Sequence, residues 1–404
     1  MTPSSVEETA MRGAIALAAR ALGETSPNPV VGCVVLDAAG RTVGEGFHAF
    51  AGGPHAEVVA LEQAGDLARG GTAVVTLEPC DHHGRTGPCS QALLDAGVRR
   101  VVYAVADPSD NASGGARRLA DAGVEIESGV LSAEAERGNA EWLTYARRGR
   151  PHVTWKFAAT LDGRSAAADG TSQWITGTAA REDVHRLRAL CDAIIAGSGT
   201  VLADDPRLTA RGFIPHDHLN THRRPLRVIA DGRARTPLGS RVLDDEAPTL
   251  VAIGEGTTAT VLEATTAVVR LPRGRRAGVD LTALLAELTE REIVSVLLEG
   301  GPTLAGAFLA EGLVDRVVAY LAPTLLGGGA AALGDAGVAT LAQAYDLDIE
   351  DITTIGPDLR IIAAVRDRAN PGEADGERPL RAGREDVDLA ALIGARPAPS
   401  RREN

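Results

Sequence analysis

The spacing of hydrophobic residues in the first 150 positions predicts helices and strands in alternation. Residues 6–22 carry apolar side chains at helical spacing and stop at Gly23. The near-continuous apolar run VVGCVVL follows, and the turn sequence DAAG predicts that RTVGEGFH returns as the second strand of a hairpin. Further along the chain we expect helix 55–69, strand 72–77, helix 88–96, strand 99–105, helix 115–122, a short strand near Val124 and helix 133–146. Apolar strands that alternate with helices are typical of a mostly parallel sheet with helices on both faces.

A second alternating segment begins at HVTWKF, after the basic and Gly/Pro-punctuated stretch RRGRP. This change predicts a domain boundary near Arg150, with domains over 1–150 and 151–368. The expected strands are DAIIAG, LRVIA, TLVAI, TAVVRL, IVSVLLE, VDRVVAYL and LRIIAAV, and the expected helices are 177–190, 279–290 and 302–311. Residues 369–404 are rich in Arg, Glu, Asp, Gly and Pro, which predicts a mostly disordered tail with at most one short helix.

Composition and charge narrow the class of substrate and partner. The chain has 404 residues and a net charge of −13, whereas proteins that bind nucleic acid show basic faces. We therefore expect a small free substrate and no nucleic acid. The four cysteines form no disulfide framework, the N-terminus lacks a signal-peptide pattern, and no stretch has the length of a membrane span. These features predict a soluble cytoplasmic protein without a membrane partner, and a homo-oligomer is a general expectation for a two-domain acidic enzyme.

The stretch from Pro54 to Cys89 has the residue types of a hydrolytic zinc site. It reads PHAEV near its start, then TAVVTL, then EPCDHHGRTGPC. A catalytic zinc uses three protein ligands of nitrogen or thiolate type and leaves the fourth position open, so His55, Cys80 and Cys89 are the candidate ligands. Glu57 is left over to move protons, the role of a non-ligand Glu in zinc deaminases with H-x-E and P-C motifs.

The spacing within this stretch constrains its local structure. Residues i and i+2 of a helix do not share a face, so His55 and Glu57 meet in one pocket only if a helix starts at His55. Gly52, Gly53 and Pro54 are typical of such a start. Both cysteines follow prolines, which suit the first turn of a helix, and a helix N-terminus lowers the pKa of a thiol.

Two alternatives compete with a catalytic zinc site. The cysteines and the histidine could be ordinary buried residues, with no metal at all. A structural zinc is the other alternative, and it would need a fourth protein ligand, which His82 or His83 could supply.

The motifs of the first domain resemble those of the cytidine-deaminase-like zinc hydrolases. More narrowly, SPNPVVG at 26–32, GGPHAEV at 52–58 and TLEPCDHHGRTGPC at 76–89 resemble the deaminase half of the bifunctional riboflavin-biosynthesis deaminase/reductase family. The eight residues between the two cysteines favour this family, because other deaminases of this class usually have two there.

This resemblance implies one zinc ion and hydrolytic deamination of an aminopyrimidine. A zinc-bound water would supply hydroxide that attacks the amino-bearing carbon, while Glu57 carries the proton to the ring and to the leaving ammonia. Asn28 and His48 are weaker candidates for lining the pocket, and a turn or surface role is as good an interpretation of each. His82, His83 and Arg85 offer donors for a substrate phosphate or a ring oxygen.

The second domain lacks a G-x-G-x-x-G after its first strand, so the sequence does not support a Rossmann dinucleotide site. It carries three short constellations instead. These are KFAATLDGR with SQWITG at 172–177, GSGTVLADDPRLTAR at 197–211, and LEGGPTLAGAFL at 298–309. Backbone N–H groups at the helix start after the Gly-Gly pair make an anion site, although glycine pairs often only turn a chain.

Together these segments resemble the reductase half of the same family, whose fold is similar to that of dihydrofolate reductase. The resemblance implies NADPH contacts at Ala158, Trp174, Thr200, Asp204, Gly232, Gly301, Pro302, Thr303, Leu304, Ala305, Gly306 and Ala307. It implies substrate contacts at Ser172, Arg188, Leu208, Arg211 and Glu299. Either arginine alone would ordinarily be read as one half of a surface ion pair, but in these motifs the two suit a bidentate grip on a ribose phosphate.

The sequence therefore predicts a fused α/β enzyme with a cytidine-deaminase-like three-layer domain and a dihydrofolate-reductase-like domain. The implied steps are deamination of 2,5-diamino-6-(5-phosphoribosylamino)pyrimidin-4-one and NADPH-dependent reduction of the ribosyl chain of the product to ribityl. One rival is a zinc deaminase for another free base or nucleoside, against which the HHGRT loop and the arginine pair argue. A second rival is a zinc module that is structural or scaffolds a partner.

Overall fold

A computed structural model describes residues 3–82, 87–109, 113–212, 224–276 and 278–366. The described residues form two compact units that meet in the chain at Arg147 and Arg148. None of the described helices is both long enough and apolar enough to cross a bilayer. The predicted tail at 369–404 lies outside the described residues.

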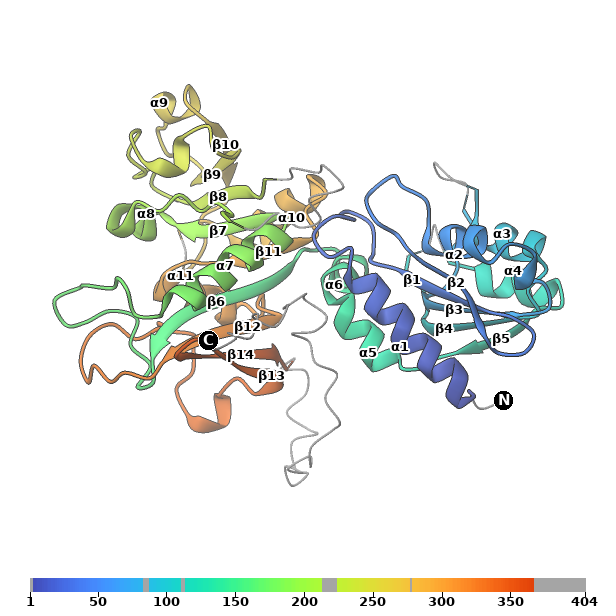
Figure 1. Cartoon of the computed structure of the whole chain (residues 1–404). Helices are drawn as coiled ribbons and strands as arrows, with labels where there is room; N and C mark the ends of the chain where they lie inside the picture. The colour runs from blue at the N-terminus through green and yellow to red at the C-terminus, as the bar shows by residue number, and fades with distance from the viewer. Residues whose placement is uncertain (1–2, 83–86, 110–112, 213–223, 277, 367–404) are drawn as a thin grey trace, which may run out of the picture. The chain divides into compact units, whose positions relative to one another are not determined.

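The first unit is built on a five-stranded mixed sheet in the order β2-β1-β3-β4-β5 (Figure 1). Its strands are β1 (Gly32–Leu36), β2 (Thr42–Phe47), β3 (Thr72–Leu77), β4 (Arg100–Val105) and β5 (Glu125–Ser128). The expected hairpin is confirmed, because β1 and β2 pair antiparallel. The expectation of a mostly parallel sheet is wrong here, because β1 also pairs antiparallel with β3, and only β3, β4 and β5 run parallel.

Helices cover both faces of this sheet, so the unit has three layers. One face packs against α1 (Ser5–Ala19), α5 (Ser132–Gly138) and α6 (Ala140–Arg148), with Met11 and Val74 fully buried between helix and sheet. The other face packs against α2 (Ala56–Ala64), α3 (Cys89–Ala96) and α4 (Gly115–Asp121), with Leu93 and Val75 fully buried. The strand β1 alternates between the two cores, which explains why every residue of it is buried.

The single helix expected over 133–146 is two helices, α5 and α6, separated at Asn139. The Asn139 backbone leaves the helical region at φ −126°. Its side-chain oxygen accepts a hydrogen bond from the buried Val30 N–H at 3.2 Å. The spacing of apolar residues continues across this break and does not predict it, because the break is caused by a polar contact with a distant segment.

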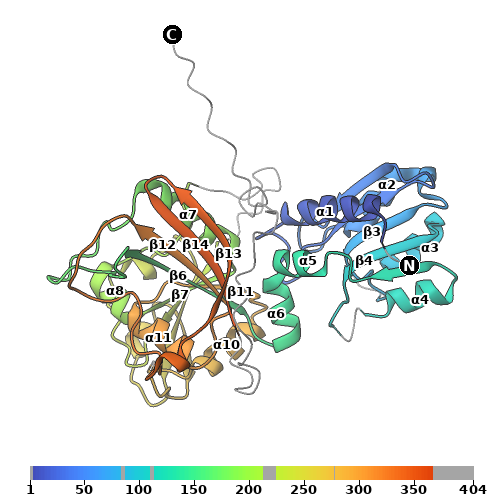
Figure 2. The same ribbon diagram turned by 90° about the horizontal axis from the view of Figure 1, so that it is seen from below.

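The second unit is built on a nine-stranded sheet in the order β10-β9-β8-β7-β11-β6-β12-β14-β13. The strands are β6 (His152–Thr160), β7 (Ala193–Gly197), β8 (Leu226–Ala230), β9 (Thr249–Gly254), β10 (Ala267–Leu271), β11 (Ser295–Leu298), β12 (Arg316–Ala322), β13 (Leu347–Ile355) and β14 (Asp358–Val365). Neighbours from β10 to β12 pair parallel. Figure 2 shows β12, β14 and β13 side by side at the other edge, where they pair antiparallel.

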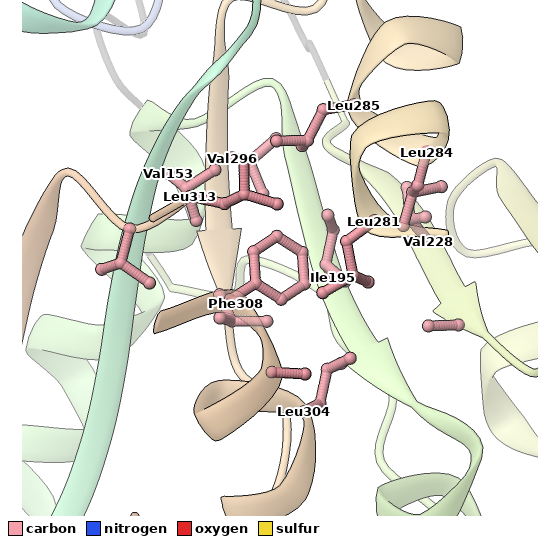
Figure 3. Packing of buried hydrophobic residues seen from close by; sticks show 14 of the residues in the cluster. Val153, Ile195, Val228, Leu281, Leu284, Leu285, Val296, Leu304, Phe308 and Leu313 are labelled. Atoms are coloured by element: carbon pink, nitrogen blue, oxygen red, sulfur yellow. The ribbon is translucent and has the colours of Figure 1, made fainter. Parts of the chain in front are cut away.

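Two hydrophobic cores cover the two faces of this sheet. Figure 3 shows the larger core, in which Phe308 of α11 (Pro302–Ala310) lies among Leu281 of α10 (Leu281–Glu290) and strand residues such as Ile195 and Val296. The opposite face packs against α7 (Thr178–Leu190), α8 (Ser198–Asp204) and α9 (Thr260–Glu263). Each central strand therefore buries both of its faces, as its uninterrupted apolar sequence predicts.

The elements of this unit that were absent from the sequence-based expectation include β13 and α8. Strand β13 reads LDIEDITTI, and its acidic residues and partial exposure hide its strand character. Helix α8 is a short stretch inside a motif that reads as a loop. Both are formed by pairing or packing with distant parts of the chain, so local spacing indicates them weakly.

We predict that Phe308→Ala lowers the free energy of unfolding of the second unit by about 3–5 kcal/mol, because it leaves a cavity in a core whose walls are helix and sheet. Denaturant unfolding measures the change. The control is Leu341→Ala, at a side chain that is 95% exposed, which should change the value by less than about 0.5 kcal/mol. A loss below about 1 kcal/mol in the Phe308 variant would show that this core collapses around the missing ring.

Candidate functional site

The start of α2 positions His55 and Glu57 together. His55 is the N-cap residue of α2, with extended backbone at φ −73° and ψ 157°, and Glu57 lies in the first turn. This is the arrangement that the H-x-E spacing required. Strand β2 passes close to α2 at Gly46, where a Cβ atom would lie 2.4 Å from the Ala56 carbonyl oxygen. Glycine at that position therefore allows the strand to hold the start of the helix.

The two cysteines come from the segment between β3 and α3. Cys89 is the first residue of α3 and follows the N-cap residue Pro88, as expected. The expectation of a helix start at Cys80 is wrong, because Cys80 lies in the loop after β3. This loop folds back on α3: the Ser90 N–H donates to the Cys80 carbonyl oxygen at 3.1 Å, and the Cys89 N–H donates to Cys80 Sγ at 3.5 Å.

The three candidate ligand atoms converge on one point. His55 Nδ1 lies 3.1 Å from Cys89 Sγ and 3.5 Å from Cys80 Sγ, and all three ligand atoms lie within 4.8 Å of one another. Zinc–nitrogen and zinc–sulfur bonds of about 2.0–2.3 Å in a tetrahedron place ligand atoms roughly 3.3–3.8 Å apart. The donor set and its spacing therefore fit zinc with three protein ligands.

The electrostatics of this cluster favour the thiolate form of Cys80 and raise the pKa of the neighbouring Glu57 carboxyl group. Hydrogen bonding from the Cys89 thiol lowers the pKa of Cys80 to about 4 against the opposing effect of burial, and His55 lowers it further. Burial raises the pKa of Glu57, and the nearby Cys80 thiolate raises it again. Glu57 is only 3% exposed and lies outside the ligand triad, so its carboxyl group is suited to carry a proton within the pocket.

His48, with Asn28 beside it, contacts the candidate zinc ligand His55. The His48 Nδ1 atom lies 3.0 Å from the Pro54 carbonyl oxygen, and His48 Nε2 lies 3.2 Å from Asn28 Nδ2. The His48 ring meets the His55 ring edge to face at 5.6 Å between centroids. His48 is buried, which argues against the surface role that its sequence left open.

A structural zinc would need a fourth protein ligand, for which His82 and His83 are the candidates. His82 is described, and it does not belong to the group of described side chains whose ligand atoms converge. Its Nδ1 atom is buried and has no hydrogen-bond partner among the described residues. His83 and Arg85 lie outside the described residues, so their predicted roles stay predictions.

The second unit contains a cavity of about 1080 Å³ at the carboxyl ends of its parallel strands. Several of the predicted site residues line it: Ala158, Ser172, Thr200, Asp204, Gly232, Glu299, Gly301, Pro302, Thr303 and Leu304. Ligands of open parallel sheets bind at this edge, because the loops that leave the strands meet there. The volume suits a cofactor together with a small substrate.

Hydrogen bonds hold the predicted cofactor segments against this cavity. Thr200 Oγ1 accepts a hydrogen bond from the Gly301 N–H at 3.2 Å, which joins α8 to the start of α11. Ser172 Oγ donates to Asp204 Oδ1 at 3.5 Å. Three segments that are far apart in the sequence therefore share one wall.

Other predicted residues lie outside the lining of the cavity. Trp174 is 70% exposed, and the Arg181 guanidinium lies 4.6 Å above its ring. Leu208 is buried in the core beside α7, α8 and α9. Ala305, Gly306 and Ala307 are buried within α11.

Arg188 binds Glu299 rather than standing free for a phosphate. Its Nε and Nη2 atoms donate to the two Glu299 carboxylate oxygens at 2.5 and 2.9 Å, and Nη1 donates to the Thr209 carbonyl oxygen at 3.2 Å. Burial would raise the pKa of Glu299, but the charge and hydrogen bonds of Arg188 lower it to about 2. Glu299 is therefore held as an oriented carboxylate on the cavity wall.

The second predicted phosphate ligand, Arg211, lies beside the same cluster. Its Nη2 atom is 3.3 Å from His185 Nε2, and His185 Nδ1 is 3.1 Å from the Thr209 carbonyl oxygen. Burial, together with the charges of Arg188 and Arg211, lowers the pKa of His185. Arg211 is exposed, so its guanidinium can reach an anion without a desolvation cost.

Comparison with known proteins assigns both units. Residues 4–105 match the family described as the cytidine and deoxycytidylate deaminase zinc-binding region, and residues 151–361 match the family described as the RibD C-terminal domain. The chain is 47% identical over 363 residues to riboflavin biosynthesis protein RibD of Mycobacterium tuberculosis, covering 90% of this chain and 98% of that one. Its identity to RibD of Escherichia coli is 43% over 364 residues, covering 87% and 98%. The chain belongs to the RibD family.

Solved structures of RibD proteins share the architecture. A structure of Acinetobacter baumannii RibD is 41% identical, covers 90% of this chain and 99% of its own, and has a TM-score of 0.80. A Thermotoga maritima structure described as a diaminohydroxyphosphoribosylaminopyrimidine deaminase/5-amino-6-(5-phosphoribosylamino)uracil reductase is 33% identical, covers 89% and 99%, and has a TM-score of 0.77. As a RibD protein, the chain is a bifunctional riboflavin-biosynthesis enzyme with a zinc-binding deaminase domain and a reductase domain that uses NADPH.

Lys156 is a cavity residue that the sequence analysis did not assign. Its ammonium lies 3.8 Å from Glu299 Oε2, and burial lowers its pKa against the opposing charge of Glu299. The sequence carried a signal for this residue, because in KFAATLDGR the lysine lies within a largely apolar strand. A charged side chain in a central strand of a RibD reductase unit needs a partner, and that partner was visible only after folding.

We predict that Cys80→Ala and Cys89→Ala each reduce the bound zinc from one equivalent to nearly none, because two remaining ligands hold zinc weakly. The metal content of the dialysed protein, measured by mass spectrometry, reports the change. The matched control is Cys33→Ala, since Cys33 is a buried free cysteine of the same unit outside the ligand group. Full zinc content in either ligand variant would remove that cysteine from the site.

Proposed function

We propose that the two units catalyse consecutive steps on one phosphorylated pyrimidine. The unit before Arg148 deaminates 2,5-diamino-6-(5-phosphoribosylamino)pyrimidin-4-one. The unit after it reduces the ribosyl chain of the product, 5-amino-6-(5-phosphoribosylamino)uracil, to ribityl. The observation that carries the first assignment is the convergence of His55, Cys80 and Cys89 beside the buried Glu57. The substrates follow the description of the Thermotoga maritima relative.

In the deaminase step, His55, Cys80 and Cys89 hold the zinc ion. Zinc at such a site supplies Lewis-acid chemistry that makes water a nucleophile at neutral pH. Glu57 would take one proton from the attacking water at its carboxylate and deliver it to the ring nitrogen. It would then take the second proton, from the hydroxyl formed on the attacked carbon, and deliver it to the amino group, which leaves as ammonia. The burial of Glu57 suits this shuttle, because bulk water does not compete for the carboxyl group. His48 keeps the His55 ring in place through its contacts with Pro54 and Asn28.

In the reductase step, the chain mainly orients its two ligands. NADPH supplies the hydride for the sugar carbon. The backbone at Gly300 and Thr303 forms the part of the cavity wall suited to the diphosphate, since a helix start presents N–H groups there, whereas the Gly301 N–H already donates to Thr200 Oγ1. Lys156 and Glu299 form a charged pair on the same wall, suited to bind the polar groups of the sugar and the ring.

Arg188 acts in this proposal as a positioning residue for Glu299. Each of its three terminal nitrogens donates a hydrogen bond toward Glu299 or Thr209, so the guanidinium fixes the carboxylate and does not reach the substrate. The exposed Arg211 stays available for the ribose phosphate of the substrate. Arg188 and Arg211, which the sequence analysis grouped as phosphate ligands, therefore have different proposed roles.

The state of the cysteines also bears on the cellular compartment. A site with two thiolate ligands and no disulfide among the described cysteines suits a reducing compartment, which supports action in the cytoplasm. The substrates proposed above are small phosphorylated pyrimidines. Self-association and the absence of nucleic-acid binding stay predictions.

We predict that Glu57→Gln abolishes ammonia release from the diaminopyrimidine phosphate, because the amide cannot carry the proton. The variant should retain one zinc ion, since Glu57 is not a ligand. NADPH oxidation with the deaminated intermediate should stay within about twofold of the wild type. Ammonia, zinc and the absorbance of NADPH measure the three quantities. If NADPH oxidation falls together with ammonia release, the two steps do not use separate sites.

We predict that Arg188→Ala lowers kcat/KM of the reductase step by roughly 10²-fold, because Glu299 loses a bidentate partner and its pKa rises toward that of a buried, unpaired acid. The loss should deepen as the pH falls, because the freed carboxylate then becomes protonated. A pH profile of the reductase step with the deaminated intermediate measures this. Arg211→Ala, by contrast, should raise KM without changing the shape of the profile. An unaltered profile in Arg188→Ala would show that Arg188 does not position Glu299.

A further inference from the structure

The two candidate zinc cysteines are far apart in the chain for ligands of one metal ion. Eight residues separate Cys80 from Cys89, whereas other deaminases of this class usually have two between their cysteines. A two-residue connection fixes the spacing of its ends by its own turn. A longer connection fixes that spacing less, because the entropy lost on closing a loop grows with its length. Contacts outside this connection must therefore hold the two sulfur atoms at the spacing that zinc needs.

A polar contact joins the residues that follow the two cysteines. Ser90 Oγ donates to Asp81 Oδ1 at 2.6 Å, and the Ser90 N–H donates to the Cys80 carbonyl oxygen at 3.1 Å. Ser90 is fully buried, so its hydroxyl group needs this partner. The Cys89 N–H in turn donates to Cys80 Sγ at 3.5 Å. Asp81 and Ser90 therefore tie the loop after β3 to the first turn of α3, one residue from each cysteine.

Arg118 of α4 donates to the same carboxylate oxygen. Its Nη1 atom lies 2.9 Å from Asp81 Oδ1, and its Nη2 atom donates to Gln91 Oε1 of α3. The Arg118 and Asp81 side chains are 39% and 26% exposed, so this ion pair by itself adds little to the free energy of unfolding. Its contribution is geometric, because one guanidinium binds both the loop after β3 and α3. We call Asp81, Ser90 and Arg118 the cysteine clamp.

The helix that carries Arg118 is itself fastened to the loop after β3. Glu78 of that loop accepts hydrogen bonds from two backbone N–H groups at the start of α4, at 3.2 Å each. A Cβ atom at Gly115 would lie 1.8 Å from the Pro79 carbonyl oxygen, so only glycine allows α4 to begin directly against the loop. The guanidinium is therefore presented to the loop by a fixed helix, which lowers the ordering cost of its contacts.

We propose that the cysteine clamp is a positioning device for the zinc site, which holds Cys80 and Cys89 at metal spacing across their long connection. The inference rests on the proposed zinc ligands and adds the residues that keep them in place. None of the clamp residues belongs to the group of converging ligand atoms, so they act through the cysteines. Zinc leaves when a ligand moves away, and Cys80 lies in a loop whereas Cys89 begins a helix. Tying the loop to α3 opposes the local opening that frees the metal.

The test measures how fast the full-length zinc-loaded enzyme releases its metal to an excess of a chromogenic chelator. Ser90→Ala and Asp81→Ala should each release zinc about tenfold faster than the wild type, because outer contacts of metal ligands typically change metal affinity by about 10–100-fold. Arg118→Ala should release it about threefold faster, since its ion pair is partly exposed. Before the chelator is added, all three variants should hold close to one equivalent of zinc, because the three ligands remain.

Two further variants separate a clamp from a general loosening of the helices. Asp81→Asn should release zinc within about threefold of the wild-type rate, because the amide oxygen still accepts the Ser90 hydroxyl hydrogen bond. The double variant Ser90→Ala/Asp81→Ala should release zinc within about twofold of either single variant, because both substitutions remove the same contact. Denaturant unfolding of each zinc-loaded variant reports stability separately from the release rate.

The matched control is Arg147→Ala, at an arginine of the same unit that pairs with Glu136 at 2.6 Å. Its side chain is 46% exposed, which is close to the exposure of Arg118. The control should leave zinc release within about twofold of the wild type, because neither partner contacts the cysteine segments.

Three outcomes would overturn the inference. Wild-type release rates in Ser90→Ala and Asp81→Ala, with or without a lower free energy of unfolding, would make the network a support of the helices alone. Release from Asp81→Asn as fast as from Asp81→Ala would show that the hydrogen bond is not what holds the ligands. Effects that multiply in the double variant would show that the two residues do not act through one contact. All three differ from a failure of the proposed function, in which the dialysed wild type holds no zinc.

Discussion

Both sites depend on one constraint of sheet geometry: a parallel strand must be left by a crossover, so the loops after neighbouring strands meet at one edge. In the second unit this edge brings together Thr200, Gly232 and Glu299, which follow β7, β8 and β11. In the first unit the loop after β3 brings Cys80 back onto α3, beside the start of α2. Loops and helix starts at these edges therefore carry most of the site residues, whereas strands and helices form the hydrophobic cores.

The two sites solve the problem of buried charge in different ways. At the deaminase site, two cysteine sulfurs and a carboxyl group share a small buried space, so a dication is the natural partner for the negative charge that these groups carry when deprotonated. At the reductase site, the protein supplies the compensation itself, because Arg188 and Lys156 surround Glu299.

The pairing of Arg188 with Glu299 shows where sequence reasoning fails. Arg188 lies in α7 and Glu299 follows β11, so 111 residues separate them along the chain. An arginine in a matched motif suggested a phosphate ligand, but the folded chain offers its guanidinium a carboxylate first. The break between α5 and α6 has the same kind of cause, since Asn139 turns to the distant Val30.

The sequence by itself determined the alternation of elements, the hairpin, the candidate zinc ligands with Glu57 and the family, because each depends on local spacing or on short motifs. The position of Lys156 beside Glu299 and that of His48 beside His55 were decided by tertiary structure. The physical reason is that a charge or a ring gains its role from what lies within a few ångströms of it. Sequence separation does not fix that distance, and strand order does.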